Sequence, residues 1–356
     1  MSPPAPVEQA PEEQSTEDST SELSFEEGQN YIVDDSSQLP FDYKGKLGRG
    51  HFAVVEKVWD RKNKKLFAMK TMEFNEARLR AQNEDRFNNE VNIIRKLKDH
   101  YHIIKVYATY VAKREFGMIL EPVATTNLSR YLDDFRDARD RGESPDPKSL
   151  ERSFGCLASG LAYIHHRQIR HKDIKPENIL VHQGHIIYTD FGISKAFTIP
   201  GESTTDGPPD FLTRRWSAPE VLDHDKRNYA ADVYSLGCVF LDILSAVCQN
   251  ITYEPGKLFT DIMDHVHEDL KSVTVPPKLS VIPELIMSMT FSDMSRRTKA
   301  SQISSSICAN DGLCCRVCHK HPGPSWTWSP AKGGYYSYVY DKEIVVETKW
   351  VYIDDP

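Results

Sequence analysis

Six consecutive positions, Asp173 to Asn178 in the stretch IRHKDIKPENILV, place a carboxylate, an amine and an amide directly before an apolar run. Polar groups beside a buried segment cost free energy unless they have partners or a task. Phosphoryl transfer needs a carboxylate to orient the attacking hydroxyl, cations beside the phosphate oxygens, and oxygen ligands for magnesium. Asp173 can supply the carboxylate and Lys175 a cation. Asn178, with Asp190 of the later TDFG segment, can supply the magnesium ligands, although each residue alone could be a solvated turn residue.

A glycine-rich stretch, GRGHFAVV, begins near residue 48. Glycine lets a backbone approach phosphates closely, so Gly48 and Gly50 could cradle a nucleotide. A dinucleotide-binding fingerprint would need a helix after the loop, whereas more alternating strand follows here. On its own, an ordinary tight turn explains the stretch equally well.

Two further charges have suitable positions for a phosphate site. Lys70 ends the alternating strand LFAMK, and Glu90 lies beside the apolar face of the next predicted helix. Either could be a surface charge, but a lysine that reaches phosphates would benefit from a carboxylate to position it. The order of glycine loop, Lys70, Glu90, Asp-x-Lys-x-x-Asn and Asp-Phe-Gly makes chance a poor explanation.

Hydrophobic periodicity indicates which elements hold these groups. From residue 41, short alternating apolar runs predict antiparallel strands, and a helix with apolar positions Phe87, Val91, Ile94 and Leu97 follows. After further strands, the segment PKSLERSFGCLASGLAYIHH predicts a helix, NILVHQGHIIYTD a hairpin, and an apolar helix begins near Asp232. Strands first and helices afterwards predict an α+β fold with a small β-rich lobe and a larger α-rich lobe.

The charge of the 356-residue chain is uneven. Its formal net charge is -8, but residues 1 to 43 contain eleven acids and no Lys or Arg, so the remainder is close to neutral. Bulk charge therefore predicts neither nucleic acid nor membrane as the main partner. Residues 1–40 are rich in Pro, Glu, Ser and Thr, and this composition predicts a disordered acidic tail.

Membrane and disulfide patterns are also missing from the sequence. No segment resembles a signal peptide, and no apolar run approaches the ~20 residues of a membrane span. The nearest, VYSLGCVFLDILSAVC, is broken by Asp242 and predicts a buried core helix. The seven cysteines are an odd number, which favours a reducing intracellular location (cytoplasmic, nuclear or both) over a disulfide framework.

Taken together, these motifs resemble the eukaryotic protein kinase family over residues 41–303. The resemblance includes SAPE (Ser217 to Glu220), DVYSLG (Asp232 to Gly237) and DMSRRTKASQI. It implies a bilobal kinase fold, with an N-lobe over 41–121, a C-lobe over 122–303 and ATP bound between them. It also implies that Arg297 pairs with Glu220.

The resemblance further implies a role for each matched position. Asp173 would be the catalytic base, Lys175 would steady the transferring phosphate, and Asn178 and Asp190 would bind Mg²⁺. Lys70, held by Glu90, would contact the α- and β-phosphates. The nucleotide-binding positions would be Gly48, Arg49, Gly50, Ala53 and Val55 in the phosphate-covering loop, Val55 and Ala68 around adenine, Leu120 behind it, and the backbone of Glu121 and Val123 pairing with the base.

The segment DIKPEN resembles the Ser/Thr branch of the family, and Thr213 matches the threonine that this branch holds against the base. The implied reaction is transfer of the γ-phosphate of Mg-ATP to a protein hydroxyl. Ala53, Leu212 and Trp216 depart from the family pattern, so substrate preference does not transfer. Two other functions compete: a pseudokinase scaffold, which would not need every chemical position, and a small-molecule kinase, which the peptide-docking motifs disfavour.

Lys172 stands where the family commonly has arginine. Arginine grips a phosphorylated residue through two bonds, whereas lysine offers a point charge. We therefore expect phosphorylation, if it occurs at Thr198, Ser203, Thr204 or Thr205, to be a weaker switch than in relatives with arginine, so that phosphatase treatment does not collapse activity by several hundred-fold.

Residues 304–356 fall outside the resemblance and have no assigned role. They contain Cys315-x-x-Cys318, which is half of a zinc motif that Cys308 or Cys314 and His321 could complete. Free thiols in a loosely packed segment are the favoured interpretation. The final segment YYSYVYDKEIVVETKWVYI is aromatic and β-branched, which predicts strands.

Overall fold

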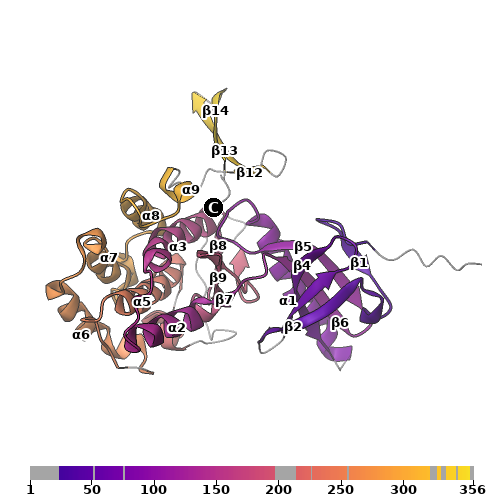
Figure 1. The fold of residues 1–356 in the computed structure, drawn as a ribbon, viewed down its shortest axis with the longest axis horizontal. Coiled ribbons are helices and arrows are strands. Elements are labelled where there is room, and N and C mark those ends of the chain that lie inside the picture. Colours follow the sequence, from indigo (N-terminus) through magenta and orange to yellow (C-terminus); the bar gives the residue numbers. More distant parts are fainter. Residues whose placement is uncertain are drawn as a thin grey trace, which may run out of the picture.

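A computed structural model describes residues 24–50, 53–74, 77–196, 214–225, 227–254, 256–320, 327–329, 334–341 and 344–352 of the chain. Its body has a small lobe built on a β-sheet and a larger lobe of helices (Figure 1). The predicted bilobal α+β fold is therefore confirmed.

The small lobe contains a six-stranded sheet with the order β1-β5-β6-β4-β3-β2. The strands are β1 (Asn30–Ile32), β2 (Phe41–Arg49), β3 (Val54–Asp60), β4 (Lys65–Glu73), β5 (Lys105–Ala112) and β6 (Glu115–Glu121). All neighbours pair antiparallel except β1, which is parallel to β5. Side chains alternate between the two faces of a strand, and both faces of this sheet carry apolar side chains that are buried in separate clusters.

Helix α1 (Ala77–Lys96) covers one face of this sheet. Its apolar stripe is buried at Phe87, Val91 and Ile94, with Leu97 just beyond its end. The same hydrophobic cluster includes Met72 and Phe116 of the sheet, as the helical periodicity predicts.

The other face of the sheet is covered by residues that were predicted to be disordered. Phe25, Val33 and Leu39 are buried against Phe67 and Ile119. The predicted boundary at residue 40 is therefore wrong for residues 24–40, because a few well-spaced apolar side chains bury even in an acidic, polar segment. Residues 1–23 lie outside the described part of the chain.

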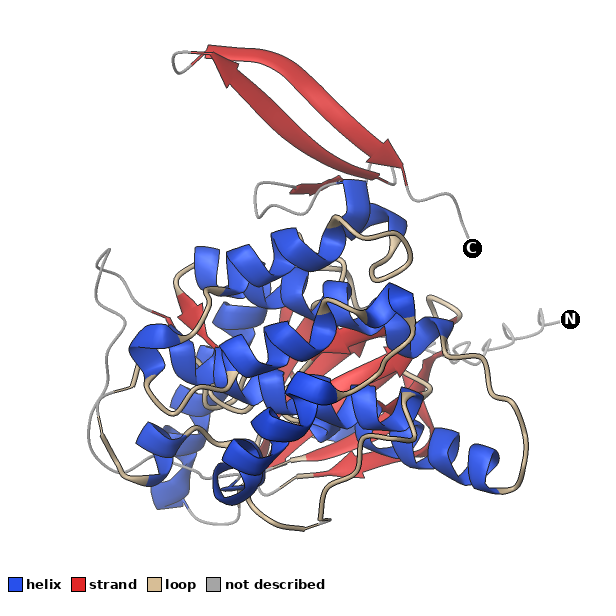
Figure 2. Cartoon of the chain, turned by 90° about the vertical axis from the view of Figure 1, so that its left-hand side faces the viewer, coloured by secondary structure: helices blue, strands red, loops and turns tan. Residues whose placement is uncertain are grey.

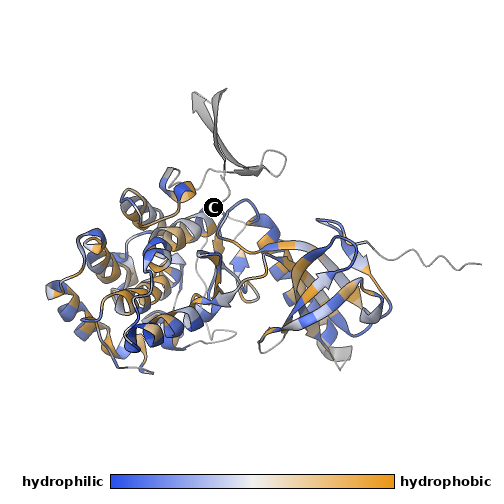
Figure 3. Cartoon of the chain, in the orientation of Figure 1, coloured by the Kyte–Doolittle hydropathy of each residue, from blue (hydrophilic) through white to orange (hydrophobic). Residues whose placement is uncertain are grey.

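The large lobe is organised around two helices, α3 (Lys148–His166) and α5 (Tyr229–Val247), whose side chains are buried on nearly every side. Figure 3 shows hydrophobic segments gathered in the interior of this lobe. Around them lie α2 (Leu128–Asp140), α4 (Pro219–Leu222), α6 (Phe259–Ser272), α7 (Ile282–Met289), α8 (Ala300–Cys308) and α9 (Arg316–Lys320). Among the described helices, α5 alone is long and apolar enough to span a membrane, but 78% of its most apolar window is buried in the protein, as expected for a core helix.

Short strands lie where the two lobes meet. β7 (Thr126–Asn127) and β10 (His185–Tyr188) both pair with β9 (Ile179–His182), and β8 (Ile169–Arg170) pairs with β11 (Lys195–Ala196). The predicted hairpin is thus confirmed, with its turn at Gly184 in the left-handed region (φ 76°). A 3₁₀ turn, η2 (Pro176–Asn178), lies between β8 and β9.

The C-terminal extension is more closely joined to the large lobe than predicted. α8 crosses the expected boundary at residue 303, and Ile303, Ile307 and Cys308 are fully buried. Cys314, Cys315 and Cys318 are also buried, so these thiols do not lie in a loosely packed segment. Beyond them, β12 (Thr327–Ser329), β13 (Gly334–Asp341) and β14 (Ile344–Tyr352) form an antiparallel sheet, which confirms the strand prediction (Figure 2).

Candidate active site

The first group of functional side chains centres on Lys70. Strand β4 holds its backbone between Val55 of β3 and Met118 of β6. Its Nζ lies 2.6 Å from Oε1 of Glu90 and 3.0 Å from Oδ1 of Asp190. The predicted pairing of Lys70 with Glu90 is therefore present, and the acid of the Asp-Phe-Gly motif joins it.

Burial and charge oppose each other in this group. Burial tends to lower the pKa of Lys70, but the carboxylates of Asp190 and Glu90 outweigh it and raise the pKa above its usual value. The positive charge of Lys70 in turn lowers the pKa of Asp190. Burial raises the pKa of Glu90, against the opposing effect of Lys70. Lys70 thus remains a cation and Asp190 an anion at neutral pH.

The second group is the loop between β8 and β9. Lys175 Nζ donates to Oδ2 of Asp173 at 2.8 Å, and Nδ2 of Asn178 donates to the same oxygen at 2.8 Å. Asn178 Nδ2 also donates to the backbone oxygen of Asp173 at 2.9 Å. Among the described residues, the bonds to this carboxylate all reach Oδ2, so Oδ1 can accept a hydrogen bond from a substrate hydroxyl.

The sequence interpretation missed one residue that positions this loop. Asp232, at the start of α5, is buried and accepts the backbone N–H of His171 and of Lys172, both at 2.9 Å. It also lies 3.0 Å from Nε2 of His165. The sequence could have indicated this role, because Asp232 lies in the first turn of a strongly apolar helix and a buried carboxylate there needs several hydrogen-bond donors.

The two groups are joined through the backbone. The N–H of Thr189, next to Asp190, donates to the carbonyl of Asn178 at 3.0 Å. Asp190 itself adopts a left-handed backbone conformation (φ 61°). The segments that carry the two predicted magnesium ligands are therefore held side by side.

Their donor set fits a hard cation. The Asp190 carboxylate is 47% exposed, so part of it is open to solvent and can meet a ligand. The Asn178 amide nitrogen is engaged by Asp173, which leaves the oxygen Oδ1 for a metal. A carboxylate and an amide oxygen are ligands that Mg²⁺ accepts, usually together with waters and phosphate oxygens.

The predicted nucleotide-binding positions lie on or beside strands β2, β3, β4 and β6 of the small lobe. Gly48 and Arg49 pair with Val55 and Val54, and the N–H of Gly50 donates to the carbonyl of Ala53 at 2.8 Å. Ala53, Ala68 and Leu120 are buried, while Val55 and Val123 are half-buried. Glu121 is the last residue of β6, and its side chain pairs with Lys65. The backbone roles of Glu121 and Val123 toward a base stay predictions.

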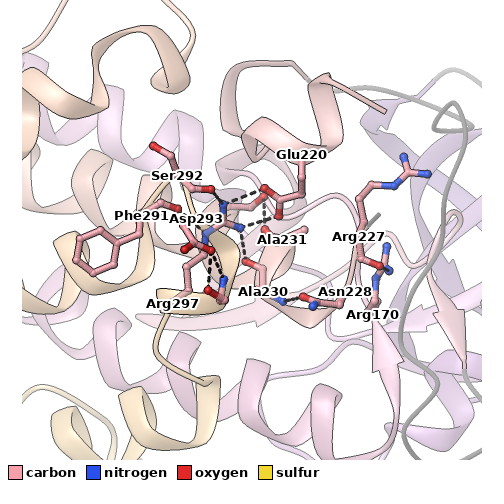
Figure 4. A network of polar contacts seen from close by, with 12 residues as sticks. Arg170, Glu220, Arg227, Asn228, Ala230, Ala231, Phe291, Ser292, Asp293 and Arg297 are labelled. Carbon is pink, nitrogen blue, oxygen red and sulfur yellow. Dashed lines mark hydrogen bonds and ion pairs between the residues drawn. The ribbon is translucent and has the colours of Figure 1, made fainter. Parts of the chain in front are cut away.

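Farther into the large lobe, the motif residues Glu220 and Arg297 form the pair that the resemblance implies (Figure 4). The guanidinium donates to both carboxylate oxygens, at 2.7 and 2.9 Å. It also donates to the carbonyls of Phe291, Ala230 and Ser292. This bidentate geometry fixes the SAPE segment to the start of α5 and to the loop that follows α7.

Several predicted residues lie outside the described part of the chain. These are Thr198, Ser203, Thr204, Thr205, Leu212 and Thr213 of the segment after Asp190, and His321 of the C-terminal extension. Trp216 is described, and its Nε1 donates to Oδ2 of Asp242 at 2.8 Å.

Comparisons with known proteins agree with this geometry. The sequence model of the family described as "Protein kinase domain" matches residues 41–307. The chain is 31% identical to a human protein named cAMP-dependent protein kinase catalytic subunit PRKX, over 58% of this chain and 53% of that protein. It is 28% identical to serine/threonine-protein kinase Nek11 of Macaca fascicularis, over 72% of this chain and 39% of that protein. The matched region thus spans about half the length of these relatives or less.

Proposed function

The chain belongs to the protein kinase family, and from that premise we propose that it is an active enzyme that transfers the γ-phosphate of Mg-ATP to Ser and Thr hydroxyls of proteins. The observation that supports activity best is that all the chemical positions are occupied by suitable groups in mutual contact. Lys70, Glu90 and Asp190 form one bonded group, and Asp173, Lys175 and Asn178 form the other.

In the proposed reaction, Asp173 orients the substrate hydroxyl and accepts its proton at Oδ1. Lys175 and Asn178 hold the carboxylate through Oδ2, so the free oxygen keeps a fixed direction. Lys175 also places a positive charge beside the transferring phosphate, and Lys70 binds the phosphates nearer the nucleoside. Mg²⁺ held by Asn178 and Asp190 would neutralise the negative charge that develops on the phosphate oxygens.

A pseudokinase that only binds partners is the main alternative. A scaffold has no need of a carboxylate with one oxygen held and one available, nor of a cationic lysine between two acids. The Ser/Thr preference rests on Lys175, two residues after Asp173, and on the names of the relatives. The partner is accordingly a protein substrate, and an intracellular location agrees with the seven free cysteines.

The test is transfer of labelled phosphate from Mg-ATP to a peptide library that contains Ser, Thr and Tyr acceptors, followed by identification of the phosphorylated amino acid. We expect label on Ser or Thr, and none with the Asp190→Asn variant. Label confined to Tyr would contradict the proposed class. ATP binding without any transfer by the wild type would favour the scaffold.

A further inference from the structure

A second cluster of reactive side chains lies outside the candidate active site. One ring nitrogen of His102 and the sulfurs of Cys156, Cys315 and Cys318 all lie within 4.8 Å of one another. All four residues are at most 6% exposed. The kinase chemistry described above uses none of them.

The four ligands come from three distant parts of the sequence. His102 lies in the loop between α1 and β5, and Cys156 lies on α3. Cys315 directly precedes α9, and Cys318 is inside it. The N–H of His319 donates to the carbonyl of Cys315 at 2.9 Å, so this stretch is a helical turn that brings both sulfurs to one side.

The histidine is oriented as a metal ligand would be. Its Nδ1 lies 2.7 Å from the carbonyl oxygen of Ile186, and because a carbonyl only accepts, Nδ1 carries the hydrogen. Nε2 therefore keeps its lone pair and faces Sγ of Cys315 at 3.4 Å. Metal-bound histidines almost always donate their second ring N–H to such an acceptor.

We propose that His102, Cys156, Cys315 and Cys318 bind one structural zinc ion in a tetrahedral Cys₃His site. Zn–S bonds of about 2.3 Å and a Zn–N bond of about 2.0 Å place neighbouring ligand atoms roughly 3.5 to 3.8 Å apart. The observed spacing needs only a small contraction to reach that geometry. Three soft thiolates with one imidazole select zinc over magnesium or calcium, and four protein ligands leave no open position for catalysis.

A disulfide accounts for the cluster less well than a metal site. A disulfide would use two of the three sulfurs and leave the third thiol buried beside the histidine, although all of these cysteines are free. The backbone N–H of Cys315 also points at Sγ of Cys156 at 3.2 Å, so this sulfur has a hydrogen-bond donor within the cluster but no disulfide partner. Of the further ligands that the sequence suggested, Cys308 directs its Sγ at the carbonyl of Gly155, Cys314 is not among the four clustered residues, and His321 lies outside the described residues.

Close packing already brings the extension to the site. The N–H of Gly155 donates to the carbonyl of Leu313 at 2.8 Å, and a Cβ at position 155 would come within 2.5 Å of Cys314 Cβ. Zinc would then fasten the extension to α3 and to the loop that follows α1. This role does not depend on catalysis, so the inference stands or falls separately from the proposed function.

The test is metal analysis of the full chain, purified with a tag that binds no metal and dialysed against a weak chelator. We expect one zinc ion per chain in the wild type and none in Cys315→Ser or Cys156→Ser. The matched controls are Cys314→Ser, whose thiol is equally buried but outside the cluster, and His319→Gln; both should retain zinc. A strong chelator should lower the thermal unfolding midpoint of the wild type and leave that of Cys315→Ser unchanged.

A second measurement uses only the wild type, in case the cysteine variants do not fold. Exchange of zinc for Co²⁺ should produce the intense visible absorption of tetrahedral cobalt and the near-ultraviolet bands of cobalt–thiolate bonds. Absence of stoichiometric zinc, a disulfide within the cluster, zinc retained by Cys315→Ser, or equal loss from Cys314→Ser would each overturn the proposal.

Discussion

The ion pair Lys70–Glu90 of the candidate active site and the pair Glu220–Arg297 of the large lobe are both largely removed from water, but they are built differently. Lys70 makes one bond to Glu90 and a second to Asp190, which is 47% exposed. Arg297 is fully buried, binds both oxygens of Glu220 and donates to three backbone carbonyls as well. Lys70 thus connects buried Glu90 to the half-exposed carboxylate of Asp190, whereas the Glu220–Arg297 pair is enclosed by protein.

This difference in exposure and bonding indicates that the two pairs have different roles. A buried charge that is fully satisfied within the protein contributes to the fold, and breaking it leaves its partner uncompensated. A lysine beside an exposed carboxylate keeps a charge available for a ligand. We therefore expect substitutions at Arg297 to act on stability and substitutions at Lys70 to act on phosphate transfer.

The largest effect on stability is expected for Arg297→Ala. Removal of the guanidinium leaves Glu220 buried without its partner, which costs about 3–5 kcal/mol in the free energy of unfolding. Denaturant unfolding measures it. A loss below about 1 kcal/mol, which is the range of exposed ion pairs, would contradict a stabilising role for the enclosed Glu220–Arg297 pair.

Lys70→Arg tests the other pair while conserving its charge. The larger planar guanidinium cannot reproduce the point contact with Glu90 and Asp190, so bound phosphates should be displaced. A misplacement of this kind costs about 10²-fold in rate, and the initial rate of transfer measures it. If Lys70→Arg lowers the free energy of unfolding by as much as it raises the barrier to transfer, the assignment of Lys70 to transfer and Arg297 to stability is wrong.

Arg297→Lys sharpens the comparison as the matched exchange. Lysine keeps the charge but cannot hold both oxygens of Glu220 and the carbonyls, so we expect a loss of about 1.5–3 kcal/mol in stability. The transfer rate per folded molecule should stay within a few-fold of wild type. A large drop in that rate with no change in unfolding would reverse the assigned roles.

The smallest effect is expected at an exposed pair. Lys271 lies 2.6 Å from Glu268 on the surface of α6, with both side chains more than half exposed. Water and salt screen such a pair, so Lys271→Gln should change neither the unfolding midpoint nor the transfer rate measurably. A clear shift in either would show that ion pairs here cannot be ranked by burial.

The residues of the candidate active site could be predicted from the sequence because they lie in short motifs with fixed spacing. Asp173, Lys175 and Asn178 share one loop, and Lys70 and Glu90 lie on elements that periodicity could identify. The role of Asp232 in positioning that loop was not predicted, because it depends on where the start of α5 lies in the folded protein.

The same limit applies to both ends of the chain. Phe25, Val33 and Leu39 are too sparse to lift the average hydrophobicity of their segment, yet each is buried on the sheet. Cys315 and Cys318 showed half of a zinc motif, but their partners His102 and Cys156 lie more than 150 residues earlier. Only tertiary structure brings such sets together.

The most direct test of the proposed catalysis is the rate of phosphate transfer by Asp173→Asn, measured beside its free energy of unfolding. An amide of the same shape cannot accept the hydroxyl proton, so we predict a rate about 10²–10⁴-fold lower than wild type in a protein of nearly wild-type stability. Transfer at the wild-type rate would contradict the account, and so would a decrease that is fully explained by the fraction of unfolded protein.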